Sequence, residues 1–171
     1  MKHVLFPSAY FDSTFAINFR ELRSKGYNGL LFDIDNTLTM HNVRAQEKEV
    51  SFFEHLKTLG FKTVLMSNNS KERVEPFARL VNTKYISRAQ KPLSWAYNKA
   101  MDMIGTSVED TIFIGDQLYT DIVGANRAGV KSILVRPISS KEAFWIKMKR
   151  VIEKPVIAAY EMTHKKNVIT F

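Results

Sequence analysis

The stretch Leu30-Leu31-Phe32-Asp33-Ile34-Asp35-Asn36-Thr37 decides the expected fold, because an apolar run passes there directly into polar residues. Other short apolar runs also end in polar or turn-forming residues, and they occupy residues 61–66, 111–114 and 131–135. Near-continuous apolar runs of this length are typical of strands that are buried on both faces of a parallel sheet. A fifth, shorter strand is expected at residues 85–87.

Amphipathic segments lie between these runs, and each predicts a helix. They span residues 49–59, 73–81, 93–104 and 121–128. A glycine follows three of these segments, as is common just after the C-terminus of a helix. The alternation of strands and helices predicts an α/β fold with a doubly wound parallel sheet.

We expect residues 29–137 to form the core with these strands and helices. The segment before this core is an aromatic extension. Residues 1–28 contain six aromatic side chains, and we expect these to pack against the flank of the sheet. Asn18 and Glu21 resemble a capping box and predict a short helix that ends before Gly26.

The segment after the core, residues 138–171, is a basic extension. We expect a helix over residues 141–154 with one apolar face, and a break or bend of that helix at Pro155. Because 171 residues are about the size of one ordinary domain, we expect residues 1–171 to form a single domain.

Composition excludes several classes of protein. The chain contains no cysteine, which excludes disulfide frameworks, thiolate metal sites and cysteine nucleophiles. No stretch approaches the roughly 20 apolar residues of a membrane-spanning helix, and no signal peptide is evident, so we expect a cytoplasmic protein. The net charge is +8, and residues 131–171 hold nine basic and three acidic side chains. This excess favours an anionic partner, whether a phosphorylated ligand, a membrane surface or a nucleic acid.

Polar side chains gather where the expected strands end. Asp33 and Asp35 follow the first strand, Ser67 the second, Lys91 the short third and Asp116 the fourth. Because ligands of doubly wound sheets bind beyond the carboxyl ends of the strands, we expect these side chains to converge. Carboxylates that lie close together repel one another, so a cluster of them needs a cation. Because all of the ligand atoms here are oxygens, we expect this cation to be Mg²⁺. A carboxylate, a metal ion and a lysine around one point are suited to phosphoryl transfer.

Four segments in this order resemble the motifs of the haloacid dehalogenase (HAD) superfamily of phosphatases. They are DIDNT at residues 33–37, Ser67, Lys91 and GDQLYTD at residues 115–121. The runs MSNNS, QKP and GDQLYTDIVGANRAG are similar to the YqeG-type phosphatases of subfamily IIIA, which are related to phosphatidylglycerophosphate phosphatases. The resemblance covers about residues 29–137 and implies the Rossmann-like core of this superfamily.

The resemblance also implies catalytic roles for three residues. Asp33 is expected to be the nucleophile that forms an aspartyl-phosphate. Asp35 is expected to protonate the leaving oxygen and then to activate the hydrolytic water. Lys91 is expected to pair with the nucleophile and the phosphate.

Binding roles follow from the same resemblance. Phosphate binding is implied for Thr37, which would orient the loop, for Ser67, and for the backbone of Asn68. A Mg²⁺ site is implied for the carboxylates of Asp33 and Asp116 and the carbonyl of Asp35. An outer position beside this site is implied for Asp121.

Two related classes of protein fit the residues less well. Receiver domains also combine an aspartate, a hydroxyl and a lysine, but they place the aspartate on a middle strand, whereas Asp33 follows the first expected strand of this sheet. The dehalogenase branch is disfavoured because Asp35 has no function when the leaving group is a halide.

The expected substrate follows from the lack of room for a cap domain. Only about eight residues, 38–45, separate DIDNT from the next helix, and an open site suits a large or membrane-bound phosphomonoester such as phosphatidylglycerophosphate. A phosphatase of small soluble phosphates or nucleotides stays open as an alternative. So does a non-catalytic module that senses phosphate or docks nucleic acid, although no nucleic-acid motif is present.

The basic helix leaves two possibilities for the surface on which the protein acts. Its lysines and aromatic residues suit peripheral contact with the anionic inner face of a membrane. The helix could equally pack on the sheet, with its lysines in solvent. The sequence does not predict the oligomeric state.

Overall fold

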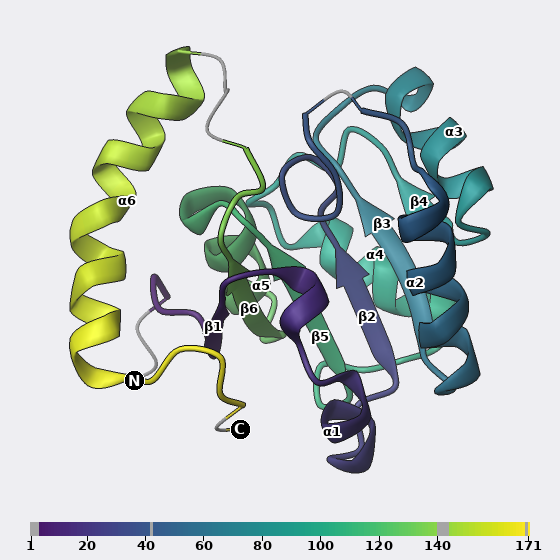
Figure 1. Cartoon of the computed structure of the whole chain (residues 1–171), viewed down its shortest axis with the longest axis horizontal. Coiled ribbons are helices and arrows are strands. Elements are labelled where there is room, and N and C mark those ends of the chain that lie inside the picture. The colour runs from purple at the N-terminus through teal and green to yellow at the C-terminus, as the bar shows by residue number, and fades with distance from the viewer. Residues whose placement is uncertain (1–3, 42, 140–143, 170) are drawn as a thin grey trace.

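A computed structural model describes residues 4–41, 43–139, 144–169 and 171, and for residues 144–150 it describes the backbone alone (Figure 1). Its centre is a six-stranded parallel sheet with the strand order β1-β6-β5-β2-β3-β4. The strands are β1 (Ala9–Phe11), β2 (Gly29–Phe32), β3 (Lys62–Met66), β4 (Lys84–Ile86), β5 (Thr111–Gly115) and β6 (Lys131–Val135). The doubly wound parallel sheet expected from the sequence is confirmed.

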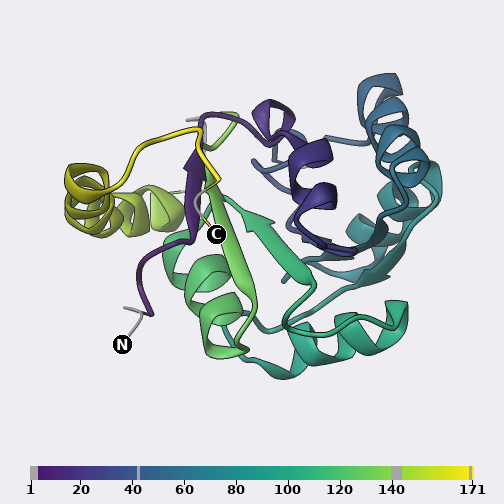
Figure 2. The ribbon, with the colours of Figure 1, turned by 90° about the horizontal axis from the view of Figure 1, so that it is seen from below.

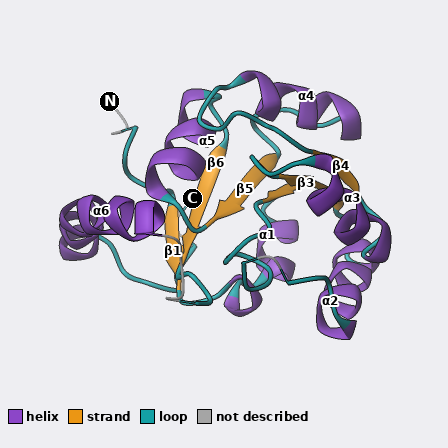
Figure 3. Ribbon diagram, turned by 90° about the horizontal axis from the view of Figure 1, so that it is seen from above, coloured by secondary structure: helices purple, strands orange, loops and turns teal. Residues whose placement is uncertain are grey.

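Helices cover both faces of the sheet (Figure 3). One face packs against α1 (Phe19–Ser24), α2 (Glu47–Thr58) and α3 (Lys71–Leu80), and the other against α4 (Trp95–Ile104) and α5 (Val123–Arg127). A 3₁₀ turn (Thr14–Ala16) precedes α1, and a π-helical turn, η2 (Leu118–Ile122), leads into α5. The last helix, α6 (Phe144–Thr163), lies outside the β1 edge of the sheet (Figure 1).

The chain reverses direction across the sheet beside β2. It proceeds from β2 outward to β3 and β4 and then returns to β5, which pairs with the other side of β2. Phe32 of β2 lies in register with Ile114 of β5, and the Asp33 N–H donates to the carbonyl of Ile114 at 2.9 Å. Residues that follow these two strands therefore meet at the point where doubly wound sheets form ligand crevices.

The N-terminal segment contributes more than the aromatic packing expected from the sequence. Residues 9–11 form the edge strand β1, which pairs in parallel with β6, beside it in Figure 2. Phe11 and Phe19 are buried in the main core, which agrees with the expectation for the aromatic residues. On the outer side of β1, the Asn167 N–H donates to the Tyr10 carbonyl at 2.8 Å, so the C-terminal tail shields part of the exposed edge.

The ends of the helices follow the predicted local signals. The side chain of Asn18 accepts a hydrogen bond from the Glu21 N–H at 3.2 Å and caps α1. Gly60 follows α2 with a φ of 85°, a left-handed conformation that glycine adopts at little cost. In contrast, α6 continues through Pro155 to Thr163, so the helix does not break at Pro155, and a bend there stays a prediction.

No cap domain interrupts the connections in the described part of the chain. The connection from β2 to α2 is a loop, and those from β3 to β5 contain only α3, β4 and α4. No helix among the described residues is long and apolar enough to span a bilayer. The division into an extension at 1–28, a core at 29–137 and an extension at 138–171 within one domain stays a prediction.

Candidate active site

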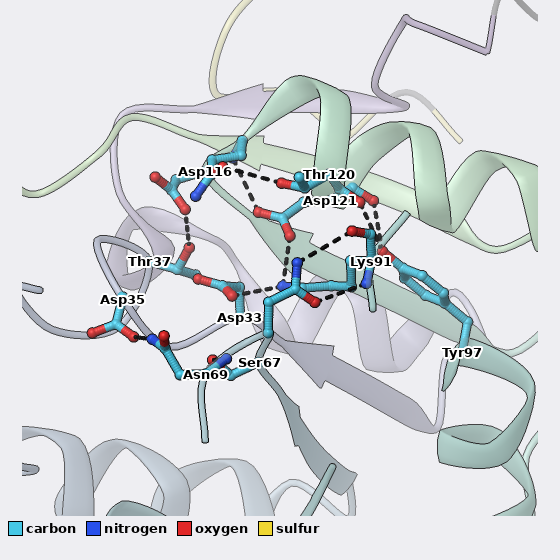
Figure 4. A network of polar contacts seen from close by, with 12 residues as sticks. Asp33, Asp35, Thr37, Ser67, Asn69, Lys91, Tyr97, Asp116, Thr120 and Asp121 are labelled. Atoms are coloured by element: carbon cyan, nitrogen blue, oxygen red, sulfur yellow. Dashed lines mark hydrogen bonds and ion pairs between the residues drawn. The ribbon is translucent and has the colours of Figure 1, made fainter. Parts of the chain in front are cut away.

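Lys91 lies at the centre of a buried polar network at the carboxyl ends of the strands (Figure 4). Its Nζ is 2.6 Å from Oδ1 of Asp33 and 2.6 Å from Oδ1 of Asp121. All three side chains are at least 90% buried. A buried ammonium between two carboxylates is stable only when its hydrogen bonds are made, and here both are short. The network therefore fixes the position of Asp33.

Asp116 completes a cluster of carboxylates around this network. One carboxylate oxygen of each of Asp33, Asp116 and Asp121 lies within 4.8 Å of those of the others, and all three residues are buried. The Thr37 hydroxyl donates to Oδ1 of Asp116 at 3.1 Å, so the loop after β2 contacts the loop after β5. Three carboxylates so close together are the oxygen-rich donor set that a divalent cation prefers.

The electrostatics of the network follow from burial and mutual proximity. Burial raises the pKa of Asp33 well above its ordinary value, the Lys91 ammonium counters this effect, and the Asp121 and Asp116 carboxylates add to the rise. Burial lowers the pKa of Lys91, but the carboxylates of Asp121 and Asp33 outweigh burial and raise it. Lys91 is therefore held as a cation, and further positive charge would favour the ionised form of Asp33.

The loop after β3 brings a hydroxyl and an amide to the same place. Ser67 is buried, and its Oγ accepts a hydrogen bond from the Asn69 N–H at 3.1 Å. The side chain of Asn68 accepts from the Lys91 N–H at 2.7 Å and donates to the Lys91 carbonyl at 3.2 Å. Asn68 thus fixes the loop that carries Lys91, a contact that the sequence analysis did not predict.

Asp35 points away from the Lys91 network (Figure 4). Its Oδ2 accepts a hydrogen bond from Asn69 Nδ2 at 2.7 Å, and its Oδ1 is 2.8 Å from Nη2 of Arg73. His41 Nδ1 lies 3.7 Å from the same oxygen. These three partners were missed from the sequence, because only the folded chain brings Asn69 of the loop after β3, Arg73 of α3 and His41 to the side chain of Asp35.

A cleft of about 210 Å³ opens onto these side chains. It is lined by Asp33, Asp35, Asn36, His41, Ser67, Asn68, Asn69, Lys91, Gln117, Thr120 and Asp121. A larger cavity of about 460 Å³ lies among α2, β3, β4 and the end of α4, but none of the expected site residues lines it. The structure thus brings every sequence-predicted site residue to one end of the sheet, with Asp35 turned away from Lys91. Thr37 and Asp116, which are hydrogen-bonded to each other, do not line the cleft.

A known protein matches almost the whole chain. The protein named "Probable phosphatase YqeG" from Bacillus subtilis is 32% identical over 160 residues, which cover 93% of each chain. The chain belongs to the YqeG-type phosphatases of the HAD superfamily. A family model described as HAD-hydrolase-like also matches residues 88–143 of this HAD phosphatase.

More distant relatives agree with this assignment. A chloroplastic phosphatidylglycerophosphate phosphatase 1 from Chlamydomonas reinhardtii is 26% identical over 155 residues, which cover 84% of this chain and 58% of the algal protein. The cobalt-bound deoxy-D-mannose-octulosonate 8-phosphate phosphatase from Haemophilus influenzae has a similar fold, with a TM-score of 0.53 and 12% identity over 80% of this chain and 91% of that chain. The HAD fold is therefore supported by both sequence and structure.

The backbone around Asp121 has further support that sequence reasoning missed. The Tyr97 hydroxyl of α4 donates toward the carbonyls of Thr120 and Asp121, at 3.2 and 3.1 Å. Burial raises the pKa of Tyr97, so its hydroxyl stays a donor. The apolar spacing of α4 predicted a buried face, but it could not show that the Tyr97 hydroxyl contacts the backbone of Thr120 and Asp121.

Proposed function

We propose that this HAD phosphatase is an Mg²⁺-dependent phosphomonoesterase that forms an aspartyl-phosphate on Asp33, with residues 29–137 as its catalytic core. One observation carries the proposal: Asp33 is a buried carboxylate at the base of a cleft, with an ammonium 2.6 Å away and two further carboxylates beside it. This arrangement suits a nucleophile whose partners neutralise the charge of a transferring phosphoryl group.

The reaction has two steps, the formation of the aspartyl-phosphate and its hydrolysis. In the first, a carboxylate oxygen of Asp33 bonds to phosphorus, the ester P–O bond breaks, and Asp35 gives its proton to the leaving oxygen. For this step Asp35 has to be protonated and to turn from Arg73 and Asn69 toward the cleft. In the second, Asp35 takes a proton from water as that water attacks phosphorus, and the bond to Asp33 breaks. The Lys91 ammonium and the Ser67 hydroxyl, with the backbone N–H of Asn68, hold the phosphoryl oxygens.

The donor set fits Mg²⁺. Within the described residues, three clustered carboxylates face the single ammonium of Lys91, which leaves an excess of negative charge. Asp33, Asp116 and the carbonyl of Asp35 would hold the ion, which would neutralise charge on the phosphate and help to orient it. Asp121 fits the outer position, because its two oxygens already accept hydrogen bonds from Lys91 and from the Gln117 N–H.

The nucleophile is tested by substitution. We expect Asp33→Asn to lose phosphate release from a soluble aryl phosphate by at least about 10⁴-fold, and Asp35→Asn to slow both steps by about 10²- to 10⁴-fold. Asp102→Asn, which changes an exposed aspartate of α4, is the matched control and should keep its activity. Retained turnover in Asp33→Asn, with an unchanged circular dichroism spectrum, contradicts the assignment.

Removal of the metal ion gives a separate prediction. We expect a chelator to stop phosphate release reversibly, and Asp116→Asn to raise the Mg²⁺ concentration needed for half of the maximal rate, because one of the anionic ligands is lost. The measurement is a Mg²⁺ titration of both proteins, with calorimetric Mg²⁺ binding as a second readout. Full activity in excess chelator would rule out the metal-dependent reaction.

The proposed substrate is a phospholipid monoester of the phosphatidylglycerophosphate type. Support comes from the similarity to the algal phosphatidylglycerophosphate phosphatase and from the lack of a cap over the cleft in the described residues. The alternative is a small soluble phosphate or nucleotide. A screen of phosphatidylglycerophosphate in micelles against soluble phosphates, compared by kcat/KM, distinguishes the two.

Peripheral contact with an anionic membrane, at the cytoplasmic face, belongs to the same proposal. Four large apolar side chains, between 40% and 52% exposed, follow the carboxyl ends of the strands: Met40, Leu93 and Ile138 on loops, and Trp95 at the start of α4. The basic and aromatic residues first expected to meet the membrane, Phe144, Trp145, Lys147, Lys149 and Arg150, lie outside the described side chains. The apolar side chains near the cleft therefore carry the structural support for this contact.

A further inference from the structure

One buried acidic side chain contacts the catalytic motif from outside the expected core. Glu153 of α6 is 1% exposed, and its Oε1 accepts a hydrogen bond from the Leu118 N–H at 2.8 Å. An ionised carboxylate is rarely buried unless hydrogen bonds compensate for its lost hydration. An apolar residue would satisfy the packing of α6, so the presence of Glu153 calls for another explanation.

The contact lies at the N-terminus of the helical segment formed by η2 and α5. The first N–H groups of a helix have no partner within it, and a negative charge there is favourable. The residue in the N-cap position, Gln117, makes no capping hydrogen bond with its side chain. Glu153 therefore supplies, from another helix, the acceptor that a local cap would otherwise provide.

The segment that Glu153 caps carries part of the candidate active site. Asp116 precedes it, and Asp121 lies within η2. Asp121 links the two ends of this turn, because its Oδ2 accepts from the Gln117 N–H at 3.0 Å while its Oδ1 holds Lys91 at 2.6 Å. A shift of the backbone at Leu118 would therefore also move its neighbour Gln117. Through the hydrogen bonds of Asp121 to the Gln117 N–H and to Lys91, this movement would displace Lys91.

Apolar packing fixes α6 against the same turn. Leu118 and Ile122 belong to a buried cluster with Tyr160 of α6, and Val156 and Ile157 of α6 pack against it. Glu153 is thus held on one side by this packing, and its carboxylate meets the backbone of the turn on the other. The hydrogen bond is therefore part of a buried contact between α6 and the 116–121 turn.

We propose that Glu153 is a positioning residue for the phosphatase reaction: it holds the 116–121 turn so that Asp116 and Asp121 keep their places around Lys91. Through Glu153, α6 helps to position the residues of the active site, although α6 follows the region that resembles the family motifs. The proposal rests on the phosphatase reaction, but not on the identity of the substrate.

The test compares Glu153→Leu, which removes the acceptor and keeps the volume, with Glu153→Gln, which keeps an acceptor oxygen. For a soluble aryl phosphate at saturating Mg²⁺, we expect Glu153→Leu to lower kcat by about 10²-fold with little change in KM, because the reacting groups are misplaced. Glu153→Gln should keep most of the wild-type kcat. The matched control is Glu161→Leu, which removes an exposed α6 carboxylate paired with Lys166 and should leave kcat unchanged.

Amide hydrogen exchange reports on the position of the turn without using activity. We expect faster exchange at residues 117–122 in Glu153→Leu, with the exchange of β2 and β5 unchanged. Unchanged exchange and unchanged kcat in Glu153→Leu would overturn the proposal. A kcat loss in proportion to the loss of folded protein, measured by circular dichroism, would also overturn it. If wild type hydrolyses no phosphomonoester, the proposed function fails, and the exchange experiment still decides whether Glu153 positions the turn.

Discussion

Gly115 shows how closely the residues of the candidate site are packed. It ends β5 directly before Asp116, and a Cβ atom at this position would lie 2.6 Å from Oδ2 and 2.7 Å from Cβ of Asp121. Neither atom belongs to a flexible chain end, since Asp121 is held by Lys91 and by the Gln117 N–H. The absence of a side chain at residue 115 is thus a requirement of the network.

We therefore expect Gly115→Ala to impair both stability and activity. Overpacking should lower the free energy of unfolding by about 1–3 kcal/mol, and displacement of Asp121 should lower kcat by about 10²-fold. The measurements are urea unfolding and turnover of a soluble aryl phosphate. Gly26→Ala is a useful comparison, because Gly26 has a φ of 93° and no atom within 4 Å of the added Cβ. It should lose about 1 kcal/mol of stability and keep its kcat, whereas equal kcat in both variants would contradict the expectation.

Among the single elements, helix α1 is stabilised by one identifiable contact at its N-terminus. The side chain of Asn18 caps its N-terminus through the Glu21 N–H. In Figure 1, α1 lies beside the start of β2, whereas the residues that line the cleft follow the carboxyl ends of the strands. We expect Asn18→Ala to lower the free energy of unfolding by about 1 kcal/mol and to leave kcat and KM unchanged. Chemical denaturation followed by circular dichroism checks this value. A stability equal to that of wild type would show that the cap contributes nothing.

Strand and helix periodicity predicted most elements but not β1. The runs around Leu31, Val64 and Ile112 are long and apolar, so burial on both faces was evident in the sequence. Residues 9–11 form only three positions of strand, and their pairing depends on β6, which lies far along the chain. No local pattern reports such a distant partner. Distant contacts also explain why α6 continues past Pro155. Val156 and Tyr160, which follow the proline, pack against a buried cluster and support the helix there.

The motifs predicted which residues gather at the site but not how each side chain points. Asp33, Lys91, Asp116 and Asp121 follow strand ends, and the topology of the sheet brings these ends to one place. The outward orientation of Asp35 depends on Arg73, whose position on α3 is set by packing of the whole layer. The roles assigned to these residues stay predictions until the substitutions above are measured.

At the level of the whole molecule, charge and exposed apolar side chains suggest how the enzyme meets its substrate. The net charge is +8. Leu93 and Trp95 follow the loop that carries Lys91, and both side chains are exposed. A membrane surface that carries the phosphomonoester would present negative charge and an apolar layer to this end of the protein.

We expect the protein to sediment with vesicles that contain phosphatidylglycerol and to be released as salt is raised, because screening shortens the reach of its charges to about 8 Å at physiological ionic strength. Replacement of both Leu93 and Trp95 by serine should weaken this binding without a change in turnover of a soluble aryl phosphate. Leu80→Ser, which removes a side chain of similar exposure at the end of α3, should bind as wild type does. Equal binding by all three proteins would exclude the apolar contact.

The parallel pairing of β1 with β6 also has a consequence for folding during synthesis on the ribosome. The Ser8 N–H bonds to the carbonyl of Ser132, a partner 124 residues further along the chain. At the usual rate of synthesis, the first strand waits on the order of ten seconds for its partner. During that interval Tyr10 and Phe11, which are buried in the finished sheet, are exposed on the nascent chain. Strand β1 is therefore made before its partner β6, and its pairing in the sheet has to wait until β6 has been made.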